Sequence, residues 1–99
     1  MNFEQIRKYA PQIKEIAHKH GISRVYVFGS VARGESTAQS DVDFLVEMQD
    51  GAPLWGAAGF GYEAEILLGI SVDVVPLSVL PQVKDRTFVQ NIQREAVLL

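Results

Sequence analysis

The stretch from Val25 to Val46 constrains the fold of this chain more strongly than any other. It begins with a continuous apolar run, Val25 to Phe28, which is typical of a short strand buried on both faces. The turn residues Gly29-Ser30 end this run, a brief helical turn fits Ser30 to Gly34, and a polar loop follows from Glu35 to Ser40. The sequence therefore predicts a buried strand, a tight turn, and a loop that leads into a second strand.

The second strand begins with a pair of carboxylates. From Val42 to Val46, an apolar residue at every second position indicates one face that enters the core. Asp41 and Asp43 stand on the opposite face, and ten residues separate Gly29-Ser30 from Asp41. Taken alone, Gly29-Ser30 is more typical of a capped turn, and each aspartate of a cap or a solvated strand residue. The fixed spacing of the two groups favours a joint role.

The rest of the chain predicts covering helices and a third strand. Residues 11–20 carry an isoleucine stripe at helical spacing, and residues 54–68 predict a second helix that a glycine closes. Its interior glycines each cost roughly 1 kcal/mol relative to alanine, so we expect its first half to be irregular. A strand follows whose only charge is Asp73, and residues 88–96 predict an amphipathic helix that runs into an apolar tail, Val97 to Leu99.

These elements predict where the carboxylates meet. If the first two strands pair antiparallel, the Gly29-Ser30 turn lies beside the start of the second strand. The long connection to the third strand fits a helical crossover, so the third strand is expected to run parallel to the second, with Asp73 beside Asp41 and Asp43. A lone carboxylate in an apolar strand is costly unless it is paired or binds a ligand, which makes Asp73 the hardest of the three to explain as structural.

Three adjacent carboxylates are a hard-oxygen donor set. Their mutual repulsion favours a bound cation, and without histidine or cysteine nearby magnesium or manganese is preferred to zinc, with one or two ions. Such ions clamp the attacking and leaving oxygens in a displacement at phosphorus. Gly29 lets the backbone approach a phosphate closely, and Ser30 adds a hydroxyl donor. The pattern predicts a nucleoside triphosphate site.

Length and composition bound the remaining choices. A chain of 99 residues is expected to form one domain, residues 1–99, of α/β (α+β) class with a three-stranded mixed sheet and flanking helices. A net charge of −3 disfavours a nucleic-acid partner, and the absence of cysteine excludes disulfides and thiolate metal sites. No apolar run is long enough to span a bilayer and no secretory signal is present, so no membrane association is expected and a cytoplasmic location is the simplest prediction.

The signature resembles that of a known family. Gly29-Ser30, ten residues, then Asp41-x-Asp43, with Ala32 to Glu35 between, is similar to the minimal nucleotidyltransferase (MNT) domains of the DNA polymerase β superfamily. Residues 72–77 resemble the third-carboxylate strand of that family, and residues 92–97 its closing helix. The resemblance covers most of the chain, but the glycine-rich stretch from Ala52 to Gly61 departs from it, because related chains usually carry a more charged helix there.

The resemblance implies an activity and a partner. Many family members are antitoxins that transfer AMP from ATP to a tyrosine of a helical HEPN toxin. Carried over by position, Gly29 and Ser30 would hold the nucleotide phosphates, and Arg33 would contact phosphate or support the loop. Asp41, Asp43 and Asp73 would hold magnesium, and Asp73 would also help to deprotonate the incoming hydroxyl.

Alternatives remain open at this point. A non-catalytic antitoxin that neutralises its partner by binding is one, and nucleotidyl transfer to a small molecule is another, which the short chain disfavours. The apolar tail is compatible with a homodimer. His18 and His20, at a helix end, are predicted to be solvated. Trp55, Phe60 and Tyr62 are more typical of core or flexible cover, and a protein partner is the next interpretation if they prove exposed.

Overall fold

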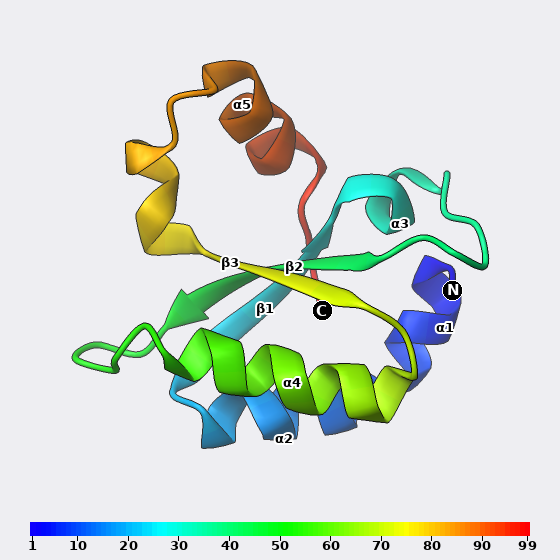
Figure 1. Cartoon of the computed structure of the whole chain (residues 1–99), viewed down its shortest axis with the longest axis horizontal. Coiled ribbons are helices and arrows are strands. Elements are labelled where there is room, and N and C mark those ends of the chain that lie inside the picture. The colour runs from blue at the N-terminus through cyan, green and yellow to red at the C-terminus, as the bar shows by residue number, and fades with distance from the viewer.

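A computed structural model describes residues 1–99 as a four-stranded sheet with helices on both faces (Figure 1). The strand order is β3-β2-β1-β4. In chain order the elements are α1 (Phe3–Lys8), α2 (Ala10–Lys19), β1 (Ile22–Phe28), α3 (Gly29–Arg33), β2 (Val42–Met48), α4 (Gly56–Leu68), β3 (Val72–Pro76), the 3₁₀ helix η1 (Leu77–Gln82), α5 (Arg86–Glu95) and β4 (Val97–Leu98).

The mixed α/β class is confirmed, but the sheet has one more strand than predicted. Helix α5 ends at Glu95, and Ala96 adopts extended backbone angles instead of continuing the helix. The next two residues form β4, which pairs antiparallel with Tyr26 and Val27 of β1. The predicted number of three strands is therefore one too few, because the apolar tail after the last helix pairs with the free edge of β1 as a fourth strand.

Strand pairing brings the signature residues to one end of the sheet. Strands β1 and β2 run antiparallel, with Phe28 opposite Asp43. Strands β2 and β3 run parallel, with Asp43 directly opposite Asp73. Both pairings agree with the topology expected from the sequence.

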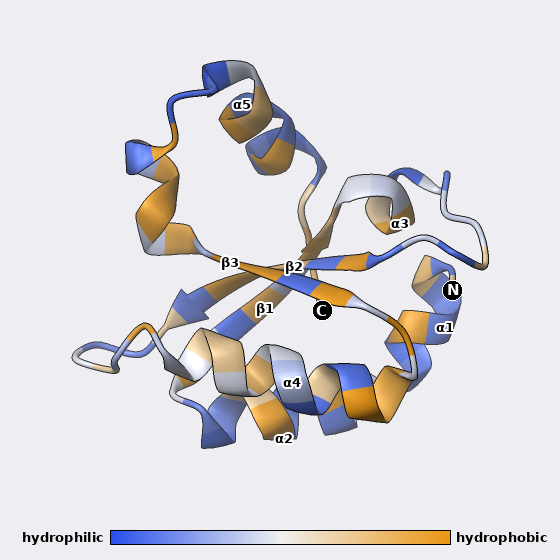
Figure 2. Cartoon of the chain, in the orientation of Figure 1, coloured by the Kyte–Doolittle hydropathy of each residue, from blue (hydrophilic) through white to orange (hydrophobic).

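Each face of the sheet has its own apolar core. Helices α2 and α4 pack side by side over one face, where Val27, Phe44 and Phe60 are fully buried. On the other face, η1 and α5 cover a smaller cluster that includes Phe28 and Leu45. Figure 2 shows the apolar residues concentrated in the strands and alternating with hydrophilic residues along the helices. Asp43 shares the strand face of Leu45, so its side chain lies on the α5 side of the sheet.

Helix α4 is regular from Gly56 to Leu68, so the predicted irregular first half is wrong. Its glycines are explained by close packing. A Cβ at Gly56 would lie 2.2 Å from the His20 carbonyl oxygen, and one at Gly59 would lie 2.6 Å from the His20 ring. His20 is also not simply solvated as predicted, because its ring contacts the Glu63 carboxylate. The glycines thus allow α4 to approach the end of α2.

We expect Gly56→Ala to destabilise the fold although alanine is the better helix former. The backbone carbonyl of His20 cannot move without shifting α2 against α4, so the free energy of unfolding should fall by about 1–3 kcal/mol. Chemical denaturation measures this change. Gly59→Ala is the matched control, because its new Cβ meets only a side-chain ring that can rotate, and it should cost less. An equal cost for both variants would contradict the packing argument.

Three aromatic residues in and beside α4 have different environments. Phe60 is fully buried and packs edge-on against Phe44 at 5.6 Å between ring centroids, which confirms its predicted core role. Trp55 and Tyr62 are 79% and 68% exposed, so a core role is wrong for both. Their exposure is the condition under which the sequence favours a protein partner. None of the helices combines the length and apolarity needed to cross a bilayer.

Candidate active site

The turn after β1 places Gly29 against the Asp43 carboxylate. Gly29 has φ of +74°, a backbone conformation that side chains with a Cβ rarely adopt. A Cβ on Gly29 would lie 2.2 Å from Oδ2 of Asp43. Glycine is thus required here by the backbone angle and by the neighbouring carboxylate. The predicted proximity of the turn and this aspartate is observed.

Asp43 and Asp73 form the acidic centre of the site. They stand opposite each other on β2 and β3, and Asp43 is half-buried while Asp41 and Asp73 are exposed. The pKa of the Asp43 carboxyl is raised to about 6. The largest cause is burial of Asp43, followed by the charge of Asp73 and the hydrogen bond between the two side chains, and the charge of Asp41 adds to this. Asp41 thus lies within electrostatic reach.

Desolvation falls on a different aspartate from the one that the sequence indicates. The apolar surroundings of Asp73 in the sequence predict that this residue bears the cost of a carboxylate inside a strand. Because β3 is the edge strand of the sheet, Asp73 is exposed, and the desolvation falls on Asp43 in the neighbouring interior strand. Periodicity alone could not give this result, because strand order decides which carboxylate is covered.

The donor set fits a hard divalent cation. The negative charges of Asp73 and Asp41 raise the pKa of Asp43, and a cation shared between these carboxylates would relieve that repulsion. No three acidic or histidine side chains already lie close enough together to form a metal site by themselves. Asp43 and Asp73 are the pair that the structure brings together, and Asp41 is the nearest further oxygen donor in the signature.

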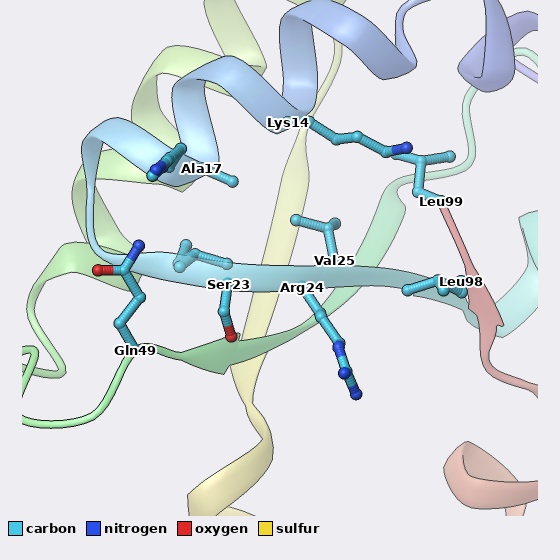
Figure 3. Close-up of a pocket in the computed structure, with 10 residues that line it drawn as sticks. Lys14, Ala17, Ser23, Arg24, Val25, Gln49, Leu98 and Leu99 are labelled. Carbon is cyan, nitrogen blue, oxygen red and sulfur yellow. The ribbon is translucent and has the colours of Figure 1, made fainter.

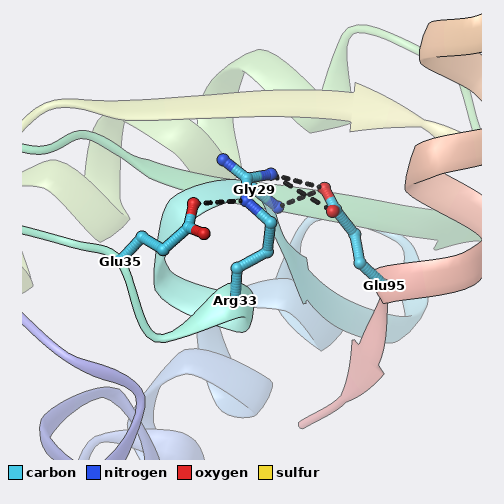
Figure 4. Close-up of polar contacts among 4 residues, drawn as sticks. All are labelled: Gly29, Arg33, Glu35 and Glu95. Atoms are coloured by element: carbon cyan, nitrogen blue, oxygen red, sulfur yellow. Dashed lines mark hydrogen bonds and ion pairs between the residues drawn. The ribbon is translucent and has the colours of Figure 1, made fainter.

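Arg33, at the end of the short helix α3, is hydrogen-bonded to two glutamates (Figure 4). Its Nε donates to Glu35 at 2.9 Å, and its Nη1 donates to both oxygens of Glu95 at 3.1 Å. The hydrogen bonds to Glu35 and then Glu95 raise the pKa of the Arg33 guanidinium above its ordinary value. Oε1 of Glu95 also accepts the Gly29 N–H at 3.0 Å.

Glu95 is the site residue that sequence reasoning missed. It ends α5, and its side chain reaches back to the turn after β1, more than sixty residues earlier in the chain. The segment that contains it resembles the closing helix of the family, but that resemblance gives this carboxylate no role. Its position inside an amphipathic helix gives no sign of a polar contact, because only the docking of α5 on the sheet creates one.

A shallow depression lies between the turn and α5. Its volume is about 300 Å³, and it combines backbone, hydroxyl, cationic and acidic groups with an apolar wall. The lining residues are Phe28, Gly29, Ser30, Arg33, Asp43, Phe88, Asn91, Ile92 and Glu95.

A larger groove lies elsewhere and shares no residue with the Gly-Ser and Asp-x-Asp signature (Figure 3). It has a volume of about 520 Å³ and lies between α2, the first half of β1 and the C-terminal residues. Lys14 and Arg24 lie on its border together with Leu98 and Leu99. Size therefore does not identify the candidate active site in this molecule, whereas the convergence of Gly29, Arg33 and Asp43 does.

Comparison with known sequences gives a consistent result. The nucleotidyltransferase domain family matches residues 7–99. A Methanocaldococcus jannaschii protein that bears the name protein adenylyltransferase is 41% identical over 87 residues, which cover 87% of this chain and 90% of that protein. The protein adenylyltransferase MntA of Thermococcus cleftensis is 39% identical over 67 residues, which cover 68% of each protein.

Solved structures agree with the fold. A minimal nucleotidyltransferase superposes with a TM-score of 0.79 and 36% identity, covering all of this chain and 97% of the other. A toxin–antitoxin complex with AMP-PNP gives a TM-score of 0.68 at 19% identity, covering 89% of this chain and 69% of the other. A tri-AMPylated Shewanella oneidensis HEPN toxin in complex with an MNT antitoxin gives 0.63 at 16% identity, covering 93% and 69%. At these identities the last two comparisons show the fold alone.

Proposed function

The chain belongs to the nucleotidyltransferase domain family, and from this membership we propose that it transfers AMP from ATP to a hydroxyl, that of a tyrosine, on a HEPN-type partner protein and so acts as an antitoxin. The family match confirms the prediction of a nucleotidyltransferase enzyme. One structural observation carries the nucleotidyl-transfer chemistry of this proposal. The register of the strands sets Asp43 opposite both Phe28 and Asp73, which brings the Gly29-Ser30 turn and the carboxylates to one end of the sheet.

The residues of the site divide into two groups. Gly29 and Ser30, with Arg33 beside them, can donate hydrogen bonds to phosphate oxygens. Asp41, Asp43 and Asp73 supply hard oxygens that would hold magnesium. The chemistry that bound magnesium supplies at such a site is neutralisation of charge on the phosphate oxygens. This division supports a nucleotide with its phosphates lying between the turn and the carboxylates.

The exposed position of Asp73 supports an acceptor on another protein. In the proposed reaction the acceptor hydroxyl oxygen bonds to the α-phosphorus, the bond to the pyrophosphate oxygen breaks, and pyrophosphate leaves. The hydroxyl proton passes to a carboxylate, and Asp73, exposed on the edge strand of the sheet, is one that a hydroxyl of a second protein can reach. The names of the relatives as protein adenylyltransferases, and an AMPylated HEPN toxin solved with an MNT antitoxin, favour AMP and this class of partner.

A labelling experiment tests the proposal. The protein is incubated with labelled ATP, magnesium and the helical product of the neighbouring gene, and incorporation of label into that product is measured. Wild-type protein should label the partner, and the double variant Asp41→Ala/Asp43→Ala should lose both labelling and protection of cells from the partner. Asp50→Ala is the matched control, because Asp50 lies in an exposed turn at the opposite end of β2.

Two outcomes would contradict the proposal in different ways. Unchanged labelling by the double variant would remove Asp41 and Asp43 from the chemistry. Full protection by the double variant in the absence of labelling would show a non-catalytic antitoxin that acts by binding.

A further inference from the structure

We propose that Glu95 sets the affinity of this site for nucleotide, because its carboxylate occupies as an internal anion the same donors that a nucleotide phosphate would use. The inference rests on the proposed function and deepens it. It adds a residue from the far end of the chain that the Gly-Ser and Asp-x-Asp signature does not contain.

The contacts of Glu95 are those of a bound anion (Figure 4). One carboxylate oxygen accepts the backbone N–H of Gly29 at 3.0 Å, and both oxygens accept Nη1 of Arg33 at 3.1 Å. A backbone N–H and a guanidinium are the donors that proteins present to phosphate oxygens. The phosphate-binding groups of the turn are therefore already arranged around a negative charge.

Burial distinguishes Glu95 from the other partner of Arg33. The Glu95 side chain is 18% exposed, whereas that of Glu35 is 66% exposed, although both form ion pairs with the same guanidinium. A largely covered carboxylate depends on its protein donors, since little water is available to replace them. Glu95 is thus a stronger competitor than Glu35 for the hydrogen-bond donors that an incoming anion would use.

A phosphate and Glu95 cannot use the Gly29 N–H together. The amide has one proton, and the Asp43 carboxylate already occupies the space that a Cβ on Gly29 would take. A third negative group brought into this space would face two carboxylates within a short distance. Nucleotide binding through this amide therefore requires the Glu95 side chain to leave.

The exchange requires only a side-chain movement. Helix α5 is anchored by Val89 and Ile92, each 1% exposed, in the cluster that covers the sheet. Glu95 is the last residue of the helix, so its side chain can rotate while the helix stays in place. Glu35 would keep its hydrogen bond to Nε of Arg33, which leaves Nη1 free for a phosphate oxygen.

Nucleotide titration of Glu95→Gln tests this inference. The change removes the charge and keeps the shape, so the dissociation constant for AMP-PNP with magnesium, measured by calorimetry, should fall roughly tenfold, as expected when a charge-assisted competitor is replaced by a neutral one. Glu95→Ala, which removes the acceptor altogether, should change affinity in the same direction. Glu35→Gln is the matched control, since it removes a charge from Arg33 but leaves Gly29 occupied, and it should not tighten binding.

The outcomes separate this inference from the proposed function. If Glu95→Gln binds AMP-PNP no more tightly than wild type, or more weakly, Glu95 is a brace for Arg33 and the inference is wrong while the function stands. Equal tightening in Glu35→Gln would also overturn it, because the effect would then be general electrostatics. If neither wild type nor the Glu95 variants bind AMP-PNP at millimolar concentration, both proposals fail. The Gly29 amide resonance gives a second readout, and nucleotide should shift it in every variant that binds.

Discussion

Replacing Asp43 by asparagine should abolish nucleotidyl transfer and at the same time stabilise the protein in the absence of metal. The raised pKa of about 6 means that the folded protein favours the protonated carboxyl more than the unfolded chain does. The associated stability is complete below the ordinary pKa of 3.8 and is lost as the pH rises through about 6. Asparagine avoids this loss, so at pH above 7 the variant should be the more stable protein.

The size and pH dependence of this effect can be measured by urea unfolding. Because Asp43 is only half-buried, solvent screening reduces the gain, and we expect on the order of 1–2 kcal/mol above pH 7 and little difference near pH 4. Losing a residue that only hydrogen-bonds to a metal ligand typically lowers activity by roughly 10- to 100-fold. Because Asp43 is itself a proposed magnesium ligand, transfer activity should fall by more than this. Asp50→Asn, at the exposed far end of β2, should change neither quantity. A variant that is less stable than wild type above pH 7 would contradict the raised pKa.

Magnesium gives the same prediction an independent check. Millimolar magnesium should stabilise the wild-type protein above pH 7, because a bound cation relieves the repulsion between Asp43 and Asp73. The Asp43→Asn variant should gain less. Equal stabilisation of both proteins would mean that the cation binds elsewhere.

The topology of the site could be predicted from the sequence because it depends on strand periodicity and connection length. The alternation from Val42 to Val46 fixes the faces of β2, and the connection before β3 is long enough for a parallel crossover. These two facts place Asp43 beside Asp73, as the structure shows. The signature spacing then adds Gly29 at the same end of the sheet.

The parts that could not be predicted depend on contacts distant in the sequence. The regular course of α4 depends on how closely the His20 carbonyl approaches Gly56, which helix propensity does not describe. The short strand β4 depends on a free edge of β1, and the role of Glu95 depends on how α5 docks on the sheet. In each case the deciding partner lies far along the chain, so no local pattern contains the information.

Replacing Gly29 by alanine should remove activity through Asp43 and not through unfolding. The φ of +74° costs about 1–2 kcal/mol for a residue with a Cβ. The new Cβ would also overlap Oδ2 of Asp43, but that oxygen ends a side chain that can rotate away. The clash is therefore relieved by displacing the Asp43 carboxylate from Asp73, which removes the arrangement that the proposed chemistry needs.

Gly51→Ala is the matched control for the backbone term. Gly51 has φ of +78° with nothing within 4 Å of the position that a Cβ would take, and it lies in the turn beyond the opposite end of β2. Both variants should lose a similar free energy of unfolding, whereas only Gly29→Ala should lose transfer activity. The carboxyl resonance of Asp43 reports the cause directly. In Gly29→Ala its pKa should fall from about 6 toward the ordinary value, because the displaced group is better hydrated and farther from Asp73. A pKa that stays near 6 in an inactive Gly29→Ala variant would show that the turn acts on the nucleotide alone and not through this carboxylate.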